Sequence, residues 1–405
     1  MKPIRINLLL RIIIAIAAGI GIGWVAPEWI ARLCATFNEI FGSFLSFLIP
    51  LIILGFVTPA IADIGRKAGA MLVATAALAY LATIVAGFGS YFTGRWLFPG
   101  LISADPALMA VEDSASVAPW FEMPMPPVMS VMTALVLAFL MGLGIAYCGG
   151  DVLRRGADEF RTIVSLAIAK AIVPLLPFYI FGIFLCMTVT GQVGTILLAF
   201  LKIIAVIFVL HVAVLLFQYC IASIFARRNP LKMLWTMMPA YFTALGTQSS
   251  AATIPVTLRQ AVKMGVTEDV AGFVIPLCAT IHMSGSTLKI VACALALMIM
   301  QGMPFDTPMF AHFICLLAVT IIAAPGTPGG AIMASLGLLT SVLGFSEAQN
   351  ALMIALYISM DSFGTACNVT GDGALAAIID RFFGKKGEKS ADAAILAGND
   401  ASDRK

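Results

Sequence analysis

Long apolar runs separated by short polar breaks recur along almost the whole chain. The segments from Leu8 to Val25 and from Leu197 to Phe217 are nearly continuously apolar, and about 20 helical residues suffice to cross the hydrocarbon core of a bilayer. Of the 405 residues, 61% are hydrophobic and 11% are charged, which is too little charge to cover a soluble protein of this size. A membrane β-barrel would instead show alternating segments of roughly 10 residues. The sequence therefore predicts an all-α polytopic membrane protein.

The positions of the basic residues predict the orientation, because cytoplasmic loops near helix ends collect Lys and Arg. Such residues cluster at the N-terminus and then at Arg66 and Lys67, at Arg154, Arg155 and Arg161, at Arg227, Arg228 and Lys232, and at Arg381, Lys385 and Lys386. The connection 99–127 contains no Lys or Arg but four acidic residues. We expect a multi-pass protein of the plasma (inner) membrane with both termini in the cytoplasm. No cleavage pattern follows the first apolar run, so we interpret it as a retained helix.

Charge and cysteine usage exclude several other classes of protein. The net charge of +3 is spread over loops of the cytoplasmic type, so it gives no support for nucleic-acid binding. The eight cysteines have no paired metal-binding or redox spacing and read as small core residues. Neither a GxSxG nor an HExxH motif is present, so the sequence predicts no enzyme and no bound cofactor.

Beyond about residue 226, the apolar runs contain residues that break helices. The run 241–257 is interrupted by Gly246, Gln248, Ser249, Ser250 and Pro255, and the run 321–336 by Pro325, Gly326, Pro328, Gly329 and Gly330. Irregular backbone is tolerated at membrane depth only inside protein or beside a wet cavity, and paired interrupted segments indicate a binding site. We therefore predict two re-entrant hairpins that meet near the bilayer midplane. The alternative is that Gly and Pro merely kink packed helices.

The last apolar span carries the strongest polar pattern. Asp361, Thr365, Asn368 and Asp372 are spaced by four, three and four residues, which places them on one stripe of a helix. A carboxylate at the bilayer centre costs roughly 2.5–3.5 kcal/mol on insertion scales. We expect these groups to bind cations or an ammonium group, the alternative being a polar stripe that only holds the bundle together.

Four segments carry a resemblance to a known family. The stretches TQSSAATIPVT, PLCATIHMSGST, GTPGGAIM and MDSFGTACNVTGD resemble the serine-rich hairpin, the NMDGT span, the second hairpin and the final helix of the dicarboxylate/amino acid:cation symporters, the glutamate and neutral amino acid transporter family. The resemblance implies eight transmembrane helices plus two re-entrant hairpins with inverted repeats, in a lipid-embedded homotrimer that works as an elevator. It also implies a division into 1–233, mainly scaffold with the first six helices, and 234–383, the transport core. The third and sixth helices are expected to join the core, and 384–405 to form a disordered cytoplasmic tail.

The resemblance also implies roles for individual residues. Asp361 matches the aspartate that holds the α-amino group of the substrate, and Asn368 matches the asparagine near its α-carboxylate. The substrate set as a whole is Ser249, Ser250, Met283, Ser286, Gly329, Asp361, Gly364, Thr365 and Asn368. The sodium set is Cys278, Thr280, His282, Asn368 and Asp372, with backbone around 324–326 closing a second sodium site. Oxygen-rich ligands of this kind suit a hard cation.

The sequence departs from the family pattern at positions that bear on substrate and coupling. Gly364 replaces the arginine that pairs with an acidic substrate side chain, so a second carboxylate is expected to lack its bidentate partner. The NMDGT motif reads HMSGS, so its aspartate is Ser284, which weakens a third sodium site. Lys289 either places a tethered ammonium near that vacated position or extends to the membrane interface. Histidine is the side chain type that ordinarily changes charge near neutral pH, so His282 is a candidate for coupling, and Lys289 is another.

Together these features predict Na⁺-coupled symport of a small neutral amino acid such as serine, threonine or alanine. The alternative inside the family is a dicarboxylate or acidic amino acid symporter, with proton coupling as a variant. Outside it, an anion channel and a mainly structural membrane protein remain as alternatives. The intramembrane acids disfavour the structural protein, and a dedicated pore would not need two gates around an ammonium-sized carboxylate site.

Overall fold

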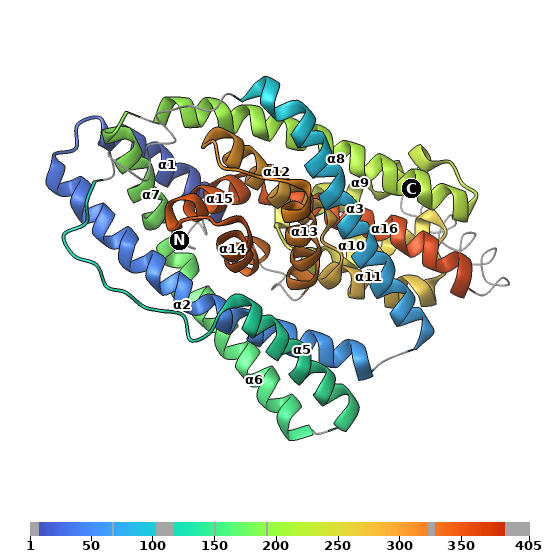
Figure 1. The fold of residues 1–405 in the computed structure, drawn as a ribbon. Helices are drawn as coiled ribbons and strands as arrows, with labels where there is room; N and C mark the ends of the chain where they lie inside the picture. The colour runs from blue at the N-terminus through green and yellow to red at the C-terminus, as the bar shows by residue number, and fades with distance from the viewer. Residues whose placement is uncertain are drawn as a thin grey trace, which may run out of the picture.

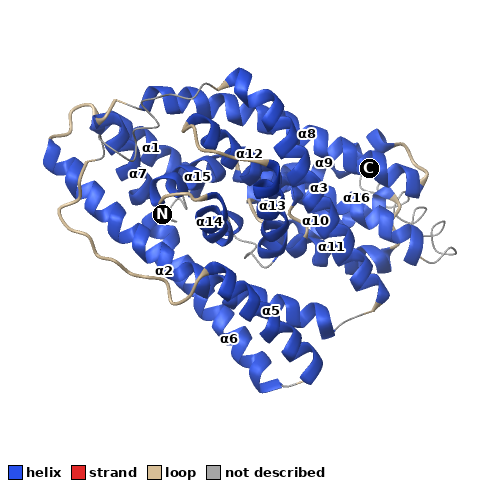
Figure 2. Ribbon diagram, in the orientation of Figure 1, coloured by secondary structure: helices blue, strands red, loops and turns tan. Residues whose placement is uncertain are grey.

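The computed structural model describes residues 8–66, 69–102, 117–149, 151–191, 193–322 and 329–384. Regular structure in these ranges is entirely helical (Figures 1 and 2). The helices are α1 (Leu8–Gly23), α2 (Glu28–Arg66), α3 (Ala70–Leu101), α5 (Val131–Cys148), α6 (Asp151–Ala167), the π-helical turn η1 (Ile168–Ile172), α7 (Val173–Val189), α8 (Val193–Ala226), α9 (Pro230–Thr247), α10 (Ser250–Met264), α11 (Glu268–Ile281), α12 (Ser284–Met300), α13 (Thr307–Ile322), α14 (Gly330–Leu343), α15 (Glu347–Ser359) and α16 (Asp361–Phe383).

The length and apolar character of these helices suit a membrane protein. Six helical stretches among the described residues are long and apolar enough to cross a bilayer, and seven if the bent pair α15 and α16 counts as one span. Helix α1 is apolar but shorter, at 16 residues. Several helices are thus able to cross a membrane, as predicted, whereas the number eight and the re-entrant course of the hairpins stay predictions.

The helices form two groups that meet along α13, α14 and α15. In the first group α2 packs against α5, α6 and α7, and α1 packs against α7. In the second group α3 packs against α12, while α8, α9 and α11 pack against α16 (Figure 1). Helices α3 and α8, which belong to the third and sixth apolar spans when α1 is counted as the first, thus contact the segment 234–383. The division into scaffold and transport core is consistent with these contacts and stays a prediction.

Both segments predicted to be hairpins contain two helices that pack against each other. Helix α9 ends at Thr247, Gln248 adopts a left-handed φ of 54°, and the Ser249 hydroxyl caps α10 by accepting from the Ala252 N–H at 3.3 Å. In the second segment, Gly329 has a φ of 76° and precedes α14. Residues 323–328, including the predicted sodium-site backbone 324–326, lie outside the described residues. The tail beyond Gly384 lies outside them too.

The two spans that follow these segments are each broken. Helix α11 ends at Ile281 and α12 begins at Ser284, and α15 ends at Ser359 and α16 begins at Asp361 with a bend of 61°. The last apolar span is therefore not one straight helix, and its four predicted polar residues all lie on α16. Asp361 lies in the first turn of α16, where the unpaired N–H groups of a helix start favour a negative charge.

Candidate functional site

The carboxylate of Asp361 lies at the centre of a buried polar cluster. Its side chain is 7% exposed. Oxygen Oδ2 accepts from the backbone N–H of Gly329 at 2.7 Å, and Oδ1 contacts the Lys289 Nζ at 3.3 Å. Gly329, at the start of α14, and Lys289, on α12, thus converge on one carboxylate from two helices. Thr365 follows one turn later on α16 and is also buried.

Lys289 does not extend to the membrane interface, and that alternative is excluded. Its side chain is 0% exposed, and its Nζ lies 3.4 Å from the centroid of the Tyr357 ring. A Cβ on Gly364 would lie 3.0 Å from this Nζ. The positive charge beside Gly364 therefore comes from the Lys289 ammonium on α12, and the absence of a bidentate guanidinium partner for a second substrate carboxylate stays a prediction.

Asn368 joins the start of α12 to α16. Its Oδ1 accepts from the N–H groups of Gly285 and Ser286 at 2.8 and 3.4 Å, which satisfies two backbone donors that a helix start leaves free. Its Nδ2 donates to the Ser286 Oγ at 3.0 Å and to the Met283 Sδ at 3.5 Å. The Tyr357 hydroxyl donates to the same Ser286 oxygen at 3.2 Å. Met283, Ser286 and Asn368, three of the predicted substrate contacts, therefore form one network.

Asp372 and His282, two residues of the predicted sodium set, contact each other directly. The His282 Nδ1 lies 2.9 Å from the Asp372 Oδ1, with both side chains at most 1% exposed. A Cβ on Gly371 would lie 2.6 Å from the imidazole Cε1, so this glycine makes room for the ring. The Gln218 Nε2 lies 3.3 Å from the His282 Nε2 and donates to the Ser284 Oγ at 3.0 Å. The group that contacts Ser284 is thus an amide from α8, and the Lys289 ammonium lies against Asp361 instead.

The other predicted residues lie at the edges of this cluster. Ser249 and Ser250 form the α9–α10 turn, which contacts α16 through a 2.8 Å hydrogen bond from the Gln248 Nε2 to the Ser362 Oγ. The Cys278 carbonyl accepts from the His282 N–H at 2.8 Å. Thr280 is exposed, and its hydroxyl donates to the Leu277 carbonyl at 2.8 Å. The structure does not bring Thr280 into the network around Asp361.

Sequence reasoning missed Tyr357, Gln218 and Gln248 as members of the site. Gln218 had a usable signal, since it is a polar residue inside an otherwise apolar run and such residues at membrane depth are conspicuous. Gln248 stood out only as an interruption. Tyr357 had no signal, because an aromatic residue in an apolar stretch reads as ordinary core.

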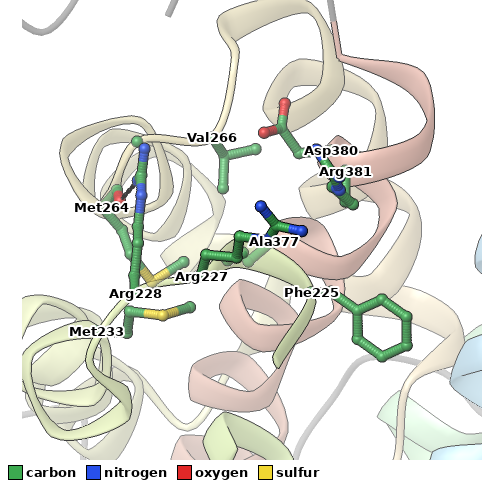
Figure 3. A pocket seen from close by; sticks show the side chains of 11 residues that line it. Phe225, Arg227, Arg228, Met233, Met264, Val266, Ala377, Asp380 and Arg381 are labelled. Carbon is green, nitrogen blue, oxygen red and sulfur yellow. Dashed lines mark hydrogen bonds between the residues drawn. The ribbon is translucent and has the colours of Figure 1, made fainter. Parts of the chain in front are cut away.

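A separate cavity lies at the other end of α16, lined among others by Arg227, Arg228, Asp380 and Arg381 (Figure 3). Asp361 and Asp380 are 19 residues apart on one helix, or about 28 Å at 1.5 Å per residue. Arg228 donates to the Met264 carbonyl, and Asp380 accepts from the backbone and hydroxyl of Thr267 at 3.0 and 2.7 Å. This cavity brings two of the predicted cytoplasmic basic clusters together and is distinct from the Asp361 cluster.

Comparison with known proteins gives a consistent result. The sequence model described as the sodium:dicarboxylate symporter family matches residues 8–382. The "Serine/threonine transporter SstT" proteins of Acinetobacter baumannii strains ATCC 17978 and AYE are similar to this chain, at 26% identity over 396 and 398 residues. These alignments cover 93% of this chain and 97% of each relative.

Proposed function

We propose that this chain, which belongs to the sodium:dicarboxylate symporter family, carries a small neutral amino acid across the membrane together with Na⁺. Membership makes it an integral membrane transporter rather than an enzyme. The choice of substrate is our inference, as are the elevator motion of 234–383, the homotrimer, the inner membrane and the cytoplasmic termini.

The observation that carries the proposal is the ammonium held by Asp361. Lys289 presents a primary ammonium 3.3 Å from the Asp361 Oδ1, and the α-amino group of an amino acid is chemically the same group. A buried carboxylate is retained at a cost of several kcal/mol unless a cation compensates it. Thr365 and Asn368, on the same stripe of α16, supply groups that hydrogen-bond a carboxylate or a small polar side chain. The site therefore suits a zwitterion.

A second candidate follows from the position of Lys289. Its ammonium lies beside Gly364, where it could pair with the side-chain carboxylate of an acidic amino acid or with a dicarboxylate. We favour the neutral substrate because Lys289 and Asp361 together carry no net charge, so a zwitterion leaves the buried site neutral whereas an acidic substrate adds a negative charge to it. The full-length relatives are named as serine/threonine transporters, which agrees with this choice.

Uptake by the purified protein in proteoliposomes separates the candidates. With an inward Na⁺ gradient, we expect saturable accumulation of L-serine, L-threonine or L-alanine above that of L-aspartate and succinate. Replacement of Na⁺ by choline should abolish it. Stronger accumulation of L-aspartate or succinate would reject the neutral substrate. A current without concentrative uptake would favour a channel.

We predict fewer than three Na⁺ per substrate. At the predicted sodium site, His282 contacts one carboxylate oxygen of Asp372, and the Asn368 Oδ1 already accepts two backbone N–H groups. Fewer oxygens are therefore free for a hard cation. The reversal potential of L-serine transport at several Na⁺ gradients gives the stoichiometry, and a value of three would contradict the prediction.

A further inference from the structure

The ammonium of Lys289 lies in a buried site formed by side chains from three helices. The lysine comes from α12, the Tyr357 ring from α15 and the Asp361 carboxylate from α16. Gly364 provides the space, because a Cβ there would lie 3.0 Å from the Nζ and 3.3 Å from the Cε of Lys289. The Tyr357 ring is oriented by its hydroxyl, which donates to the Ser286 Oγ. A cation over an aromatic face and beside a carboxylate is stabilised by both groups.

Both oxygens of Asp361 already have partners. Oδ1 contacts Lys289, and Oδ2 accepts from the N–H of Gly329. A substrate ammonium that joined Lys289 on the same carboxylate would place two ammonium groups side by side against one acid, and their repulsion is strong in a buried, low-dielectric site. A substrate that binds Asp361 through its ammonium must therefore displace Lys289.

We propose that Lys289 is a tethered substitute for the substrate ammonium. In the empty transporter it pairs with Asp361, so the buried pair carries no net charge. When a zwitterion binds, its ammonium takes the place on Asp361 and its carboxylate compensates the released Lys289 ammonium, so the site again has no net charge. The empty core then returns across the membrane without a bare carboxylate, whose transfer through a low-dielectric environment would be expensive. This inference rests on the proposed function.

The consequence is a difference between two transport modes. Net uptake requires the empty core to return, whereas exchange of internal for external substrate requires only the loaded core to move. Replacement of Lys289 by methionine keeps most of the side-chain length but removes the charge. Lys289→Met should therefore slow net uptake while exchange persists.

The test uses the full-length protein in proteoliposomes with radiolabelled L-serine. For Lys289→Met we expect Na⁺-driven net uptake to fall at least tenfold, with counterflow into L-serine-loaded vesicles staying within threefold of wild type. Lys170→Met, at an exposed lysine in η1, should change neither rate. Equal losses of net uptake and counterflow would overturn the proposal, as would the absence of any effect on both.

A stability measurement without substrate keeps the inference testable if the variant folds poorly. We expect Lys289→Met and Asp361→Asn each to lower the Tm, and the double variant to lower it by less than the sum of the two shifts. Additive Tm shifts would show that Lys289 and Asp361 do not stabilise each other, and would overturn the proposal. Wild type that accumulates no L-serine would instead reject the proposed function, so the two failures are distinguishable.

Discussion

The long helices near the N-terminus and the short, broken helices of the C-terminal half place their polar groups differently. In the most apolar stretch of the span Val131–Cys148, 28% of the residues are buried inside the protein. In the corresponding stretch of Glu268–Met300, 94% are buried. The polar network of Lys289, Asp361, Asn368 and Asp372 lies entirely among the buried helices. Irregular backbone and charge are tolerated at membrane depth where protein surrounds them. The comparison teaches that the first region supplies apolar surface and the second supplies chemistry.

Among single substitutions, the largest loss of L-serine uptake and of stability is expected at Asp361. Asp361→Asn leaves the buried Lys289 without its carboxylate, which typically costs about 3–5 kcal/mol, and it removes the proposed ammonium partner. We expect L-serine uptake to fall at least 100-fold in the transport assay, together with a lower Tm. The Asp361→Asn, Lys289→Met double variant should recover much of the stability but not the uptake. Uptake close to wild type in the single variant would contradict the assigned role.

A smaller effect in the same region is expected at Gly364. Gly364→Ala places a Cβ 3.0 Å from the Lys289 Nζ, and overpacking of this kind costs about 1–3 kcal/mol. Gly272→Ala on α11, where a Cβ meets nothing within 4 Å, is the matched control. It should stabilise by about 0.5–1 kcal/mol, because alanine is the better helix former. Equal Tm values for the two variants would show that Lys289 is not held against Gly364.

The smallest effect is expected in the N-terminal region. Arg32 and Glu28 form a 2.9 Å ion pair with both side chains well exposed, and such pairs contribute about 0–1 kcal/mol. Arg32→Gln should therefore leave Tm and L-serine uptake within error of wild type. A decrease in Tm as large as that of Gly364→Ala would show that the N-terminal region is as sensitive to substitution as the buried polar network.

Much of this arrangement could be predicted from residue patterns alone. The apolar runs indicated a helical membrane protein, and the spacing from Asp361 to Asp372 correctly placed four polar residues on one helix. The interruption at Gln248 marked where α9 ends. Each of these features is local, and the periodicity of side chains along a helix is sufficient to find it.

The parts that could not be predicted depend on contacts between distant segments. The break between α15 and α16 at Met360 could not be predicted, because no Gly or Pro is adjacent to it. Lys289 and Asp361 are 72 residues apart, and a single sequence does not specify which face of α12 meets α16. The positive charge beside Gly364 could not be predicted for this reason, because Lys289 supplies it from another helix. Gln218 reaches Ser284 across a similar separation of 66 residues.

The most direct test compares L-serine with 3-hydroxypropionate, the same molecule without its α-amino group. In a thermal-shift titration of the purified protein in Na⁺, ligand raises the Tm only by binding the folded state. If a buried carboxylate binds the substrate amine, L-serine should raise the Tm in a saturable way and 3-hydroxypropionate should not. An equal shift with equal affinity for both compounds would contradict the central role of Asp361.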